Sequence, residues 1–417
     1  MRSKLLAKSL YLVEYFSKMF KIDVKYILKG GSLLGTNQVT SAIISFLLTI
    51  AFANFLPQEI FGTYKYVLAT YTLLAILSLP GIDTAIIETA AKGNHGAFWH
   101  SIKTKFKWGF IGTLVSFSYA LYHLYSGSTE LFWVFVLVGL FMPFMEALST
   151  YTGFLNGERK YGLMTISEFI NQIISATSIF FVIYFTDSIY ILVSVYFLSY
   201  ILAKGIMVIY IGRNYIKNTN FDPTYLDYGK QLTWFQIVTR GVSSIDSLVL
   251  FHFLGPIQVA IFSIANAIPQ RVQSVFKLTG TLAFPKYANV EEKVLAKTLP
   301  KKMLLFGLLI FFVCLVYIAL IPYFFKFFFP KYLESVNYTQ LLIFYNLSAI
   351  TYPFASYLNA HRKIKENYMI AIVSFLVKAL TLIIFVPIFG IWGAVWSILA
   401  SSWSNIIFAF VLLRRIK

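Results

Sequence analysis

Residues 303–325 read MLLFGLLIFFVCLVYIALIPYFF, a run of 23 residues without a charge. Such a run is long enough to cross the hydrocarbon layer of a membrane, about 30 Å thick, as an α-helix. Charged residues make up only 12% of the 417-residue chain and apolar residues 58%, whereas a soluble domain carries about twice that charged share. The chain is therefore predicted to be an all-α integral membrane protein.

Similar apolar stretches recur along the whole chain, and we count twelve. Twelve helices of about 22 residues use most of the chain, so only short loops remain and no soluble domain is predicted. The predicted spans are 33–54, 66–91, 108–125, 131–155, 163–186, 189–212, 230–253, 257–285, 303–325, 338–360, 368–388 and 391–413.

Basic residues predict the orientation of these spans. The chain has 35 Lys and Arg against 17 Asp and Glu, an excess that in a membrane protein reports topology rather than a nucleic-acid partner. Of the 35, 27 fall in the termini and alternate loops on one side, and three, Lys65, Lys326 and Lys331, fall on the other. Cytoplasmic loops retain Lys and Arg, so both termini of this multi-pass protein are predicted to be cytoplasmic.

Residues 1–29 contain seven basic residues and have no apolar core typical of a cleavable signal peptide. Their apolar residues recur at helical spacing, and several lysines mark another face. The segment is predicted to be a basic amphipathic helix on the membrane surface.

A weak internal repeat divides the spans into two sets of six. A shift of 198 residues places Gln38 on Gln236 and Ser45 on Ser243, and it aligns Phe-Leu at 55–56 with Phe-Leu at 253–254. The most polar loop, 213–229, lies between the sixth and seventh spans. We expect an N-lobe at 30–212, a cytoplasmic linker at 213–229 and a C-lobe at 230–417, related by an axis along the membrane normal as in transporters with parallel repeats.

The sequence has no motif typical of an enzyme. It contains no P-loop, no zinc-binding His pair and no nucleophile elbow, and its five histidines are scattered. Its single cysteine, Cys314, can form no internal disulfide. The protein is predicted not to be an enzyme and to hold no metal or other cofactor.

Cations within the predicted spans are the first candidates for a binding site, because a charge at the bilayer centre is costly and normally faces a cavity or a partner. Arg240 lies near the middle of the seventh span, and Arg271 and Lys277 lie in the eighth. The guanidinium fork of Arg suits phosphate and carboxylate oxygens. We interpret the three as binding an anionic substrate, with pairing to buried acids as the alternative.

Buried acids are the second candidates. Asp83, Asp246 and Glu146 lie in predicted spans, where they could couple transport to H⁺ or Na⁺, or could pair with the cations. The sequence does not distinguish these two interpretations.

Proline and glycine mark candidate hinges. Pro80 and Gly81 interrupt the second span, and Pro269 and Gly280 lie in the eighth. Because proline lacks the amide donor that a helix needs, Pro80 should free the Ile76 carbonyl and bend the helix, and Pro269 should act likewise. Packing is an equally good explanation, since both residue types are common in membrane helices.

Three segments resemble the polysaccharide transporter family, which includes O-antigen flippases. The first runs from Gly30 through Gln38 into FLPQEIFGTY at 55–64. The second, Asp246 to Pro269, contains FLGP at 253–256 and IFSIA at 261–265, and the third is GIWGAV at 390–395. The likeness covers nearly the whole chain in length and span count.

This resemblance implies a two-lobed fold shared with multidrug and toxin extrusion (MATE) proteins, with spans one, two, seven and eight around a central cavity. It also implies a function: alternating access that moves an undecaprenyl-pyrophosphate-linked oligosaccharide, such as an O-antigen or capsule repeat unit, from the cytoplasmic to the outer leaflet of the bacterial inner membrane. Membrane lipids, a polysaccharide polymerase and glycosyltransferases would be its partners.

Two other functions compete with this one. A cation-coupled multidrug antiporter of the same superfamily should have an acidic or apolar cavity, which the three cations do not favour. A membrane enzyme such as a polymerase should have a sizeable outer loop or a catalytic acid and His constellation, and the sequence shows neither.

Overall fold

The computed structural model describes the backbone of residues 24–288, 292–361 and 363–416. The side chains of 24–37, 278–288, 292–297 and a few single positions lie outside this description. Most of the predicted amphipathic segment, residues 1–23, is therefore outside the described residues, and 24–29 form the start of the first helix.

Helices account for nearly all of the described chain. The first half contains α2 (Val24–Phe55), α3 (Gln58–Leu74), the 3₁₀ helix η1 (Ala75–Ser78), α4 (Ile82–Ala91), α5 (Ala97–Tyr125), α6 (Thr129–Ala147), α7 (Thr150–Gly157), α8 (Tyr161–Phe185) and α9 (Ile189–Asn214). The second half contains α10 (Thr224–Leu254), α11 (Pro256–Ala288), α12 (Glu292–Phe328), η2 (Pro330–Tyr332), α13 (Ser335–Leu342), η3 (Ile343–Thr351), α14 (Tyr352–Ala360), α15 (Ile364–Phe389) and α16 (Ile391–Ile416).

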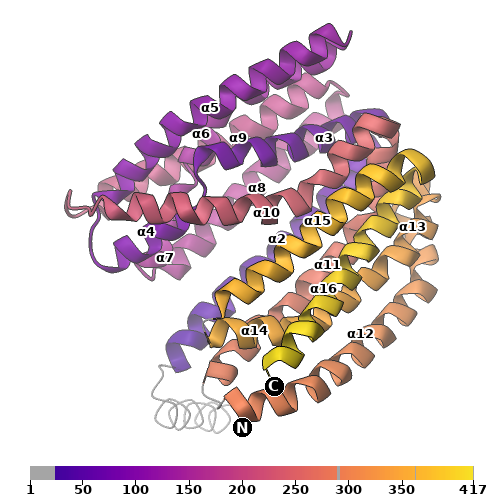
Figure 1. Cartoon of the computed structure of the whole chain (residues 1–417). Coiled ribbons are helices and arrows are strands. Elements are labelled where there is room, and N and C mark those ends of the chain that lie inside the picture. Colours follow the sequence, from indigo (N-terminus) through magenta and orange to yellow (C-terminus); the bar gives the residue numbers. More distant parts are fainter. Residues whose placement is uncertain (1–23, 289–291, 362, 417) are drawn as a thin grey trace, which may run out of the picture.

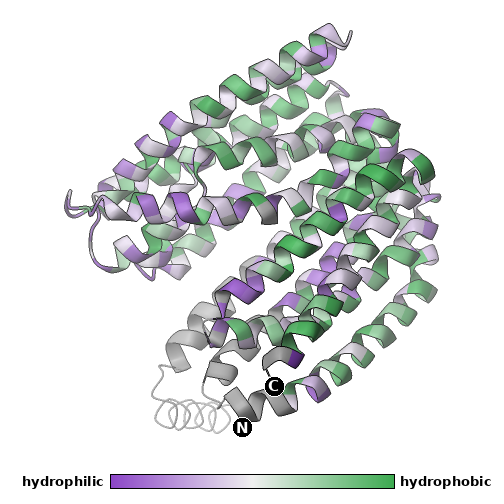
Figure 2. Ribbon diagram, in the orientation of Figure 1, coloured by the Kyte–Doolittle hydropathy of each residue, from purple (hydrophilic) through white to green (hydrophobic). Residues whose placement is uncertain are grey.

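Nine stretches of the described chain are long and apolar enough to cross a membrane, and Figure 2 shows the hydrophobic residues along α12, α15 and α16. The protein is thus a multi-pass, all-helical membrane protein, as predicted. The nine stretches are Gln38–Phe55, Gln58–Ser78, Thr129–Gly157, Tyr161–Phe185, Ile189–Asn214, Thr298–Phe328, Ser335–Asn359, Lys365–Phe389 and Ile391–Arg414. The remaining long helices, α5, α10 and α11, carry charged residues, and the count of twelve spans stays a prediction.

The helices form two lobes that converge at one end and diverge at the other (Figure 1). One lobe contains α3–α9, and the other contains α11–α16. Helix α10 joins them, because it contacts α3 and α4 in the first lobe and α15 in the second. Helix α2 packs on α8 and also touches α11.

The converging end is held by close backbone contact between α3 and α11. A Cβ atom on Gly62 would lie 1.8 Å from the carbonyl oxygen of Pro256, so only glycine fits at this position. Nearby, the Lys331 ammonium donates to the Asn54 carbonyl at 2.7 Å, and the Asn54 amide donates to the Phe328 carbonyl at 2.9 Å. These contacts tie the α2–α3 corner to the second lobe.

Replacing Gly62 with leucine should force the lobes apart at this end. Overpacking a tight contact costs about 1–3 kcal/mol, and here the clash is with backbone that cannot rotate away. We expect a lower thermal stability. We also expect that, when Asn54→Cys is added as a reporter, its thiol reacts faster with a water-soluble maleimide. Gly162→Leu is the matched control, because nothing lies within 4 Å of a Cβ at Gly162. Equal maleimide rates in the two variants would contradict this role of Gly62.

The predicted linker is fastened to the first lobe. Asn218 accepts a hydrogen bond from the His95 backbone N–H at 3.1 Å and donates to the Gly93 carbonyl at 2.9 Å. The Gly96 N–H donates to the Asn220 carbonyl at 3.0 Å. Asp222 then accepts the Thr224 N–H at 2.9 Å at the start of α10, and this bond lowers the pKa of Asp222. Helix α10 therefore begins in contact with the first lobe.

The predicted break at Pro80 is present. Helix α3 ends at Leu74, one 3₁₀ turn follows, Leu79 adopts a left-handed conformation at φ 56°, and α4 begins at Ile82. The Ile76 carbonyl is not left free, because it accepts the Leu79 N–H at 3.2 Å. Helix motion at Pro80 stays a prediction.

The other hinge candidates differ from Pro80. A Cβ at Gly81 would lie 2.2 Å from the Gly229 carbonyl oxygen, so Gly81 allows α10 to pack closely. Helix α11 continues through Pro269, whose carbonyl accepts a bond from the Asn346 side chain at 3.3 Å. Gly280 lies within α11, in the stretch whose side chains are not described. A hinge role for these three residues also stays a prediction.

Candidate functional site

Three ion pairs hold the three acids proposed as coupling residues. Each acid lies inside the helical bundle, and each has a cation from a different helix within 4.0 Å. The pairs are Asp83 with Lys105, Glu146 with Arg240, and Asp246 with Lys378. Of the three cations that the sequence singled out, only Arg240 pairs with one of these acids, whereas Asp83 and Asp246 pair with lysines outside that set.

The first pair lies in the N-lobe, between α4 and α5. The Lys105 ammonium is fully buried and donates to both oxygens of Asp83 at 2.7 Å. It also donates to the Ser149 hydroxyl at 3.0 Å. A buried ammonium has three protons to place, and these partners satisfy them.

The second pair joins the first lobe to α10. Glu146 on α6 accepts the Tyr71 hydroxyl of α3 at 2.7 Å, and its other oxygen lies 3.8 Å from the guanidinium of Arg240 on α10. Lys204 of α9 lies close enough to interact with Glu146 electrostatically and donates to the Met145 carbonyl at 3.5 Å. Arg240 is thus engaged in linking the lobes, although 27% of its side chain remains exposed.

The third pair lies in the C-lobe, between α10 and α15. The Lys378 ammonium is 2.6 Å from one oxygen of Asp246 and also donates to the Val242 carbonyl at 2.5 Å. Both side chains are less than 10% exposed. The pair forms one wall of a polar pocket of about 390 Å³, and Lys277 also lines this pocket.

Two cations that the sequence singled out have no acidic partner among the described residues. Arg271 is exposed near the middle of α11, and Lys277 is exposed further along the same helix. The charge of Arg271 also acts on Lys65 of α3, across the interface between the lobes. Among the described residues Lys65 has no acidic partner either, so Lys65, Arg271 and Lys277 are positive charges on α3 and α11 that no described acid pairs with.

Sequence reasoning missed Lys65 and Lys105. It assigned Lys65 to an outer loop because the second span was expected to begin at residue 66, whereas α3 begins at Gln58 and includes Lys65. It assigned Lys105 to a cytoplasmic loop, but α5 begins at Ala97 and buries Lys105 completely. The unbroken run of residues without Pro from 97 to 125 was a signal for this longer helix.

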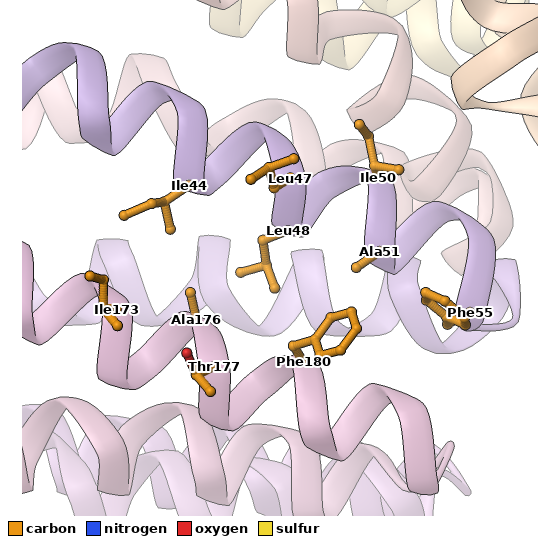
Figure 3. A pocket seen from close by; sticks show the side chains of 10 residues that line it. All are labelled: Ile44, Leu47, Leu48, Ile50, Ala51, Phe55, Ile173, Ala176, Thr177 and Phe180. Atoms are coloured by element: carbon orange, nitrogen blue, oxygen red, sulfur yellow. The ribbon is translucent and has the colours of Figure 1, made fainter.

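A second, apolar pocket of about 450 Å³ lies between α2 and α8 (Figure 3). Nine of its ten lining residues are apolar, and Thr177 is the exception. It holds no charge and lies apart from the cations, so it belongs to the lipid-facing side of the bundle rather than to the polar site.

Nothing in the described part of the chain forms a metal centre. No three His, Cys, Asp or Glu side chains group there closely enough to hold an ion. The Cys314 thiol is buried and donates to the Ile343 carbonyl at 3.5 Å.

Solved structures with the same fold include transporters in two conformations. An inward-facing multidrug resistance MATE family transporter matches with a TM-score of 0.70 at 12% identity, over 90% of this chain and 94% of its own. An outward-facing conformation of such a transporter matches with a TM-score of 0.59 at 12% identity, over 93% and 96%. The lipid II flippase MurJ, in an inward closed conformation, gives 0.68 at 13% identity, over 93% and 87%.

These matches establish a MATE-like fold. No curated protein sequence matches the chain. The sequence model of the polysaccharide biosynthesis protein family matches residues 27–291, which is more than half of the chain. The protein therefore belongs to the polysaccharide biosynthesis protein family.

Proposed function

We propose that this protein is a flippase that moves an undecaprenyl-pyrophosphate-linked oligosaccharide across the bacterial inner membrane by alternating access. The observation that carries the proposal is the charge pattern between the lobes. The three candidate coupling acids are each paired with a cation, whereas Lys65, Arg271 and Lys277 have no acidic partner among the described residues. Uncompensated cations inside a membrane protein favour an anionic passenger.

A pyrophosphate group fits these cations chemically. Arg271 offers a planar fork of donors, and Lys65 and Lys277 offer compact point charges. Because Lys65 lies on α3 and Arg271 on α11, one phosphate group between them would contact both lobes. The substrate headgroup would thus sit where relative movement of the lobes changes its access.

The arrangement of the lobes supports entry from the cytoplasm. The lobes are joined at the end that carries Lys331 and the α2–α3 corner. The loop 92–96 and the linker 213–223, which together hold three basic residues, lie at the opposite, diverging end (Figure 1). Basic loops mark the cytoplasmic side. In this state the headgroup enters from the cytoplasmic leaflet while the lipid tail stays in the membrane.

The proposed substrate also implies which enzymes act before and after this protein. Glycosyltransferases would supply the lipid-linked glycan on the cytoplasmic side, and a polymerase would consume it on the outer side. A cation-coupled multidrug antiporter is the competing function. It would bind cationic drugs and exchange them for H⁺ or Na⁺ at a buried acid, but the ammonium or guanidinium groups beside Asp83, Glu146 and Asp246 oppose a second cation at each of these acids.

A proteoliposome assay tests the proposal directly. The purified chain is reconstituted with a fluorescent polyprenyl-pyrophosphate-linked disaccharide in one leaflet, and a membrane-impermeant quencher measures how much of it changes leaflet. We expect the quenched fraction to rise with the protein and not with empty vesicles. A polyprenyl glycoside without the pyrophosphate is the matched control lipid, and it should move much more slowly.

Drug transport provides the contrary outcome. Ethidium uptake driven by an H⁺ or Na⁺ gradient, together with no movement of the pyrophosphate-linked lipid, would replace the flippase with the antiporter. Equal movement of the charged and uncharged polyprenyl lipids would instead remove the role of the cations.

A further inference from the structure

The polar pocket in the C-lobe has a chemistry of its own. Its volume of about 390 Å³ falls in the lower part of the range for small-molecule sites, roughly 300–1,000 Å³. Five elements contribute polar side chains to its walls. They are α10 (Ser243, Asp246), α11 (Asn266, Gln270, Gln273, Ser274, Lys277), η3 (Tyr345), α15 (Lys378) and α16 (Ser401, Ser402).

Helix α11 presents one continuous polar face to this pocket. Most of its polar residues are spaced three or four positions apart, which places them along one side of a helix. They are Asn266, Gln270, Gln273 and Lys277, together with Ser274 next to Gln273. This polar face ends at the exposed side chain of Lys277. The pocket is therefore a groove along α11 with a cation at one end.

Three buried oxygens in the pocket wall have no hydrogen-bond partner within the described chain. They are Oδ1 of Asp246, Oδ1 of Asn266 and the hydroxyl of Tyr345. A buried polar atom without a partner costs free energy comparable to a lost hydrogen bond. Three such atoms around one cavity point to an occupant that supplies the missing bonds.

The serines in the wall show which kind of bond is missing. Ser243 donates to the Arg240 carbonyl at 2.8 Å, Ser274 to the Gln270 carbonyl at 3.0 Å, and Ser401 to the Ser374 carbonyl at 2.8 Å. Their protons are used, so their oxygens can only accept. Together with the free carboxylate and amide oxygens, they make the pocket rich in acceptors. An occupant that donates hydrogen bonds would match these acceptors.

The charge of the pocket decides between a cation and a neutral donor. Lys378 lies 2.6 Å from Asp246 and neutralises it, and Lys277 then leaves the pocket with a net positive charge. A metal ion or a cationic drug would be repelled. Sugar hydroxyls donate and accept hydrogen bonds without charge, and the side-chain amides of Gln270 and Gln273 can donate to sugar oxygens in return.

We infer that this pocket is a saccharide subsite that binds one neutral sugar ring of the transported glycan. The inference rests on the proposed function and names a part of the substrate. Arg271 directly follows Gln270 but lies on the neighbouring face of α11, toward Lys65. A sugar in the pocket and a phosphate at Arg271 would therefore be adjacent, as they are in a glycan linked through pyrophosphate.

Ligand-observed saturation-transfer NMR on the full chain in lipid nanodiscs tests the inference. The probes are methyl glycosides of glucose, galactose, N-acetylglucosamine and N-acetylgalactosamine, with tetraphenylphosphonium as a cationic probe, and sodium NMR relaxation reports Na⁺ binding. We expect saturation transfer to at least one glycoside. Tyr345→Phe, which removes a hydroxyl and little volume, should weaken its binding about fivefold, the effect of losing one hydrogen bond.

Two matched variants control for effects on folding. Tyr332→Phe removes another buried hydroxyl without a partner among the described residues. Asn171→Leu removes a buried amide whose oxygen also has no partner there, and neither residue lines the pocket. Both should bind the glycoside like the unmodified chain, while Asn266→Leu should lose binding. Equal effects of pocket and control variants would overturn the inference.

Three further outcomes separate this inference from the proposed function. Binding of Na⁺ or tetraphenylphosphonium that is lost in Tyr345→Phe, with no glycoside binding, would make the pocket a cation site and overturn the subsite. Normal flipping of the pyrophosphate-linked disaccharide by Asn266→Leu would overturn the subsite while the flippase stands. Absence of flipping by the unmodified chain would remove the flippase itself, whatever the glycoside result.

Discussion

Replacing Arg271 with alanine should slow the flipping of the pyrophosphate-linked disaccharide by about 10- to 100-fold. A hydrogen bond to a charged group contributes about 1.5–3 kcal/mol, and each 1.4 kcal/mol corresponds to a factor of ten. Arg271 makes no ion pair in the part of the chain that the structure describes, so its removal leaves no protein charge newly unpaired. The loss should therefore fall on transport rather than on folding, and the proteoliposome assay measures it.

Two further variants of Arg271 and one control variant at a distant lysine test whether the charge of Arg271 is what matters. Arg271→Glu should place an acid opposite Lys65 and abolish transport, and Arg271→Lys should retain part of it because the charge remains without the planar fork. Lys326→Ala is the control, since Lys326 is exposed on α12, away from α3 and α11. If Arg271→Ala flips the lipid as fast as Lys326→Ala at equal protein levels, Arg271 does not bind the headgroup.

Replacing Lys378 with methionine should destabilise the C-lobe strongly. Lys378 and Asp246 are 7% and 8% exposed, so the substitution leaves a buried carboxylate without its partner. Breaking a buried ion pair in this way costs about 3–5 kcal/mol. We expect a lower unfolding temperature in nanodiscs and a reduced yield of folded protein.

The double variant shows whether the pair itself is responsible. Lys378→Met combined with Asp246→Asn removes both charges, and it should recover most of the stability lost in Lys378→Met alone. If Asp246 instead exchanged protons during transport, the double variant would be stable and would lose its response to a pH gradient. A double variant as unstable as Lys378→Met would show that Lys378 acts through its contact with the Val242 carbonyl rather than through Asp246.

Much of the fold could be predicted from the sequence because hydrophobic length is a local property. The run at 303–325 became part of α12, and the break at Pro80 appeared where the missing amide required it. The limits of the helices were harder to predict. A charged residue at the edge of an apolar run was assumed to lie outside the membrane span, which put Lys65 and Lys105 in loops. Both lie inside helices.

For the candidate site, the sequence could predict which types of residue take part but not how they are paired. The sequence indicated that Arg240, Arg271 and Lys277 were unusual at their depth, but it could not tell which of them had an acidic partner. Arg240 on α10 meets Glu146 on α6, 94 positions away in the chain. Arg271 and Lys277 meet no acid among the described residues, so the proposed anionic site shifts toward α11 and Lys65.

The sequence by itself determined that the chain is a helical membrane protein with a large excess of basic residues, because crossing a bilayer requires runs of about 20 apolar residues and loop charge follows topology. Only the tertiary structure decided which charges are neutralised. Lys378 reaches Asp246 across 132 positions of sequence, and Lys105 reaches Asp83 from a neighbouring helix. Electrostatic compensation acts over a few ångströms in space, and the distance between two side chains in space is fixed by helix packing rather than by their separation along the chain.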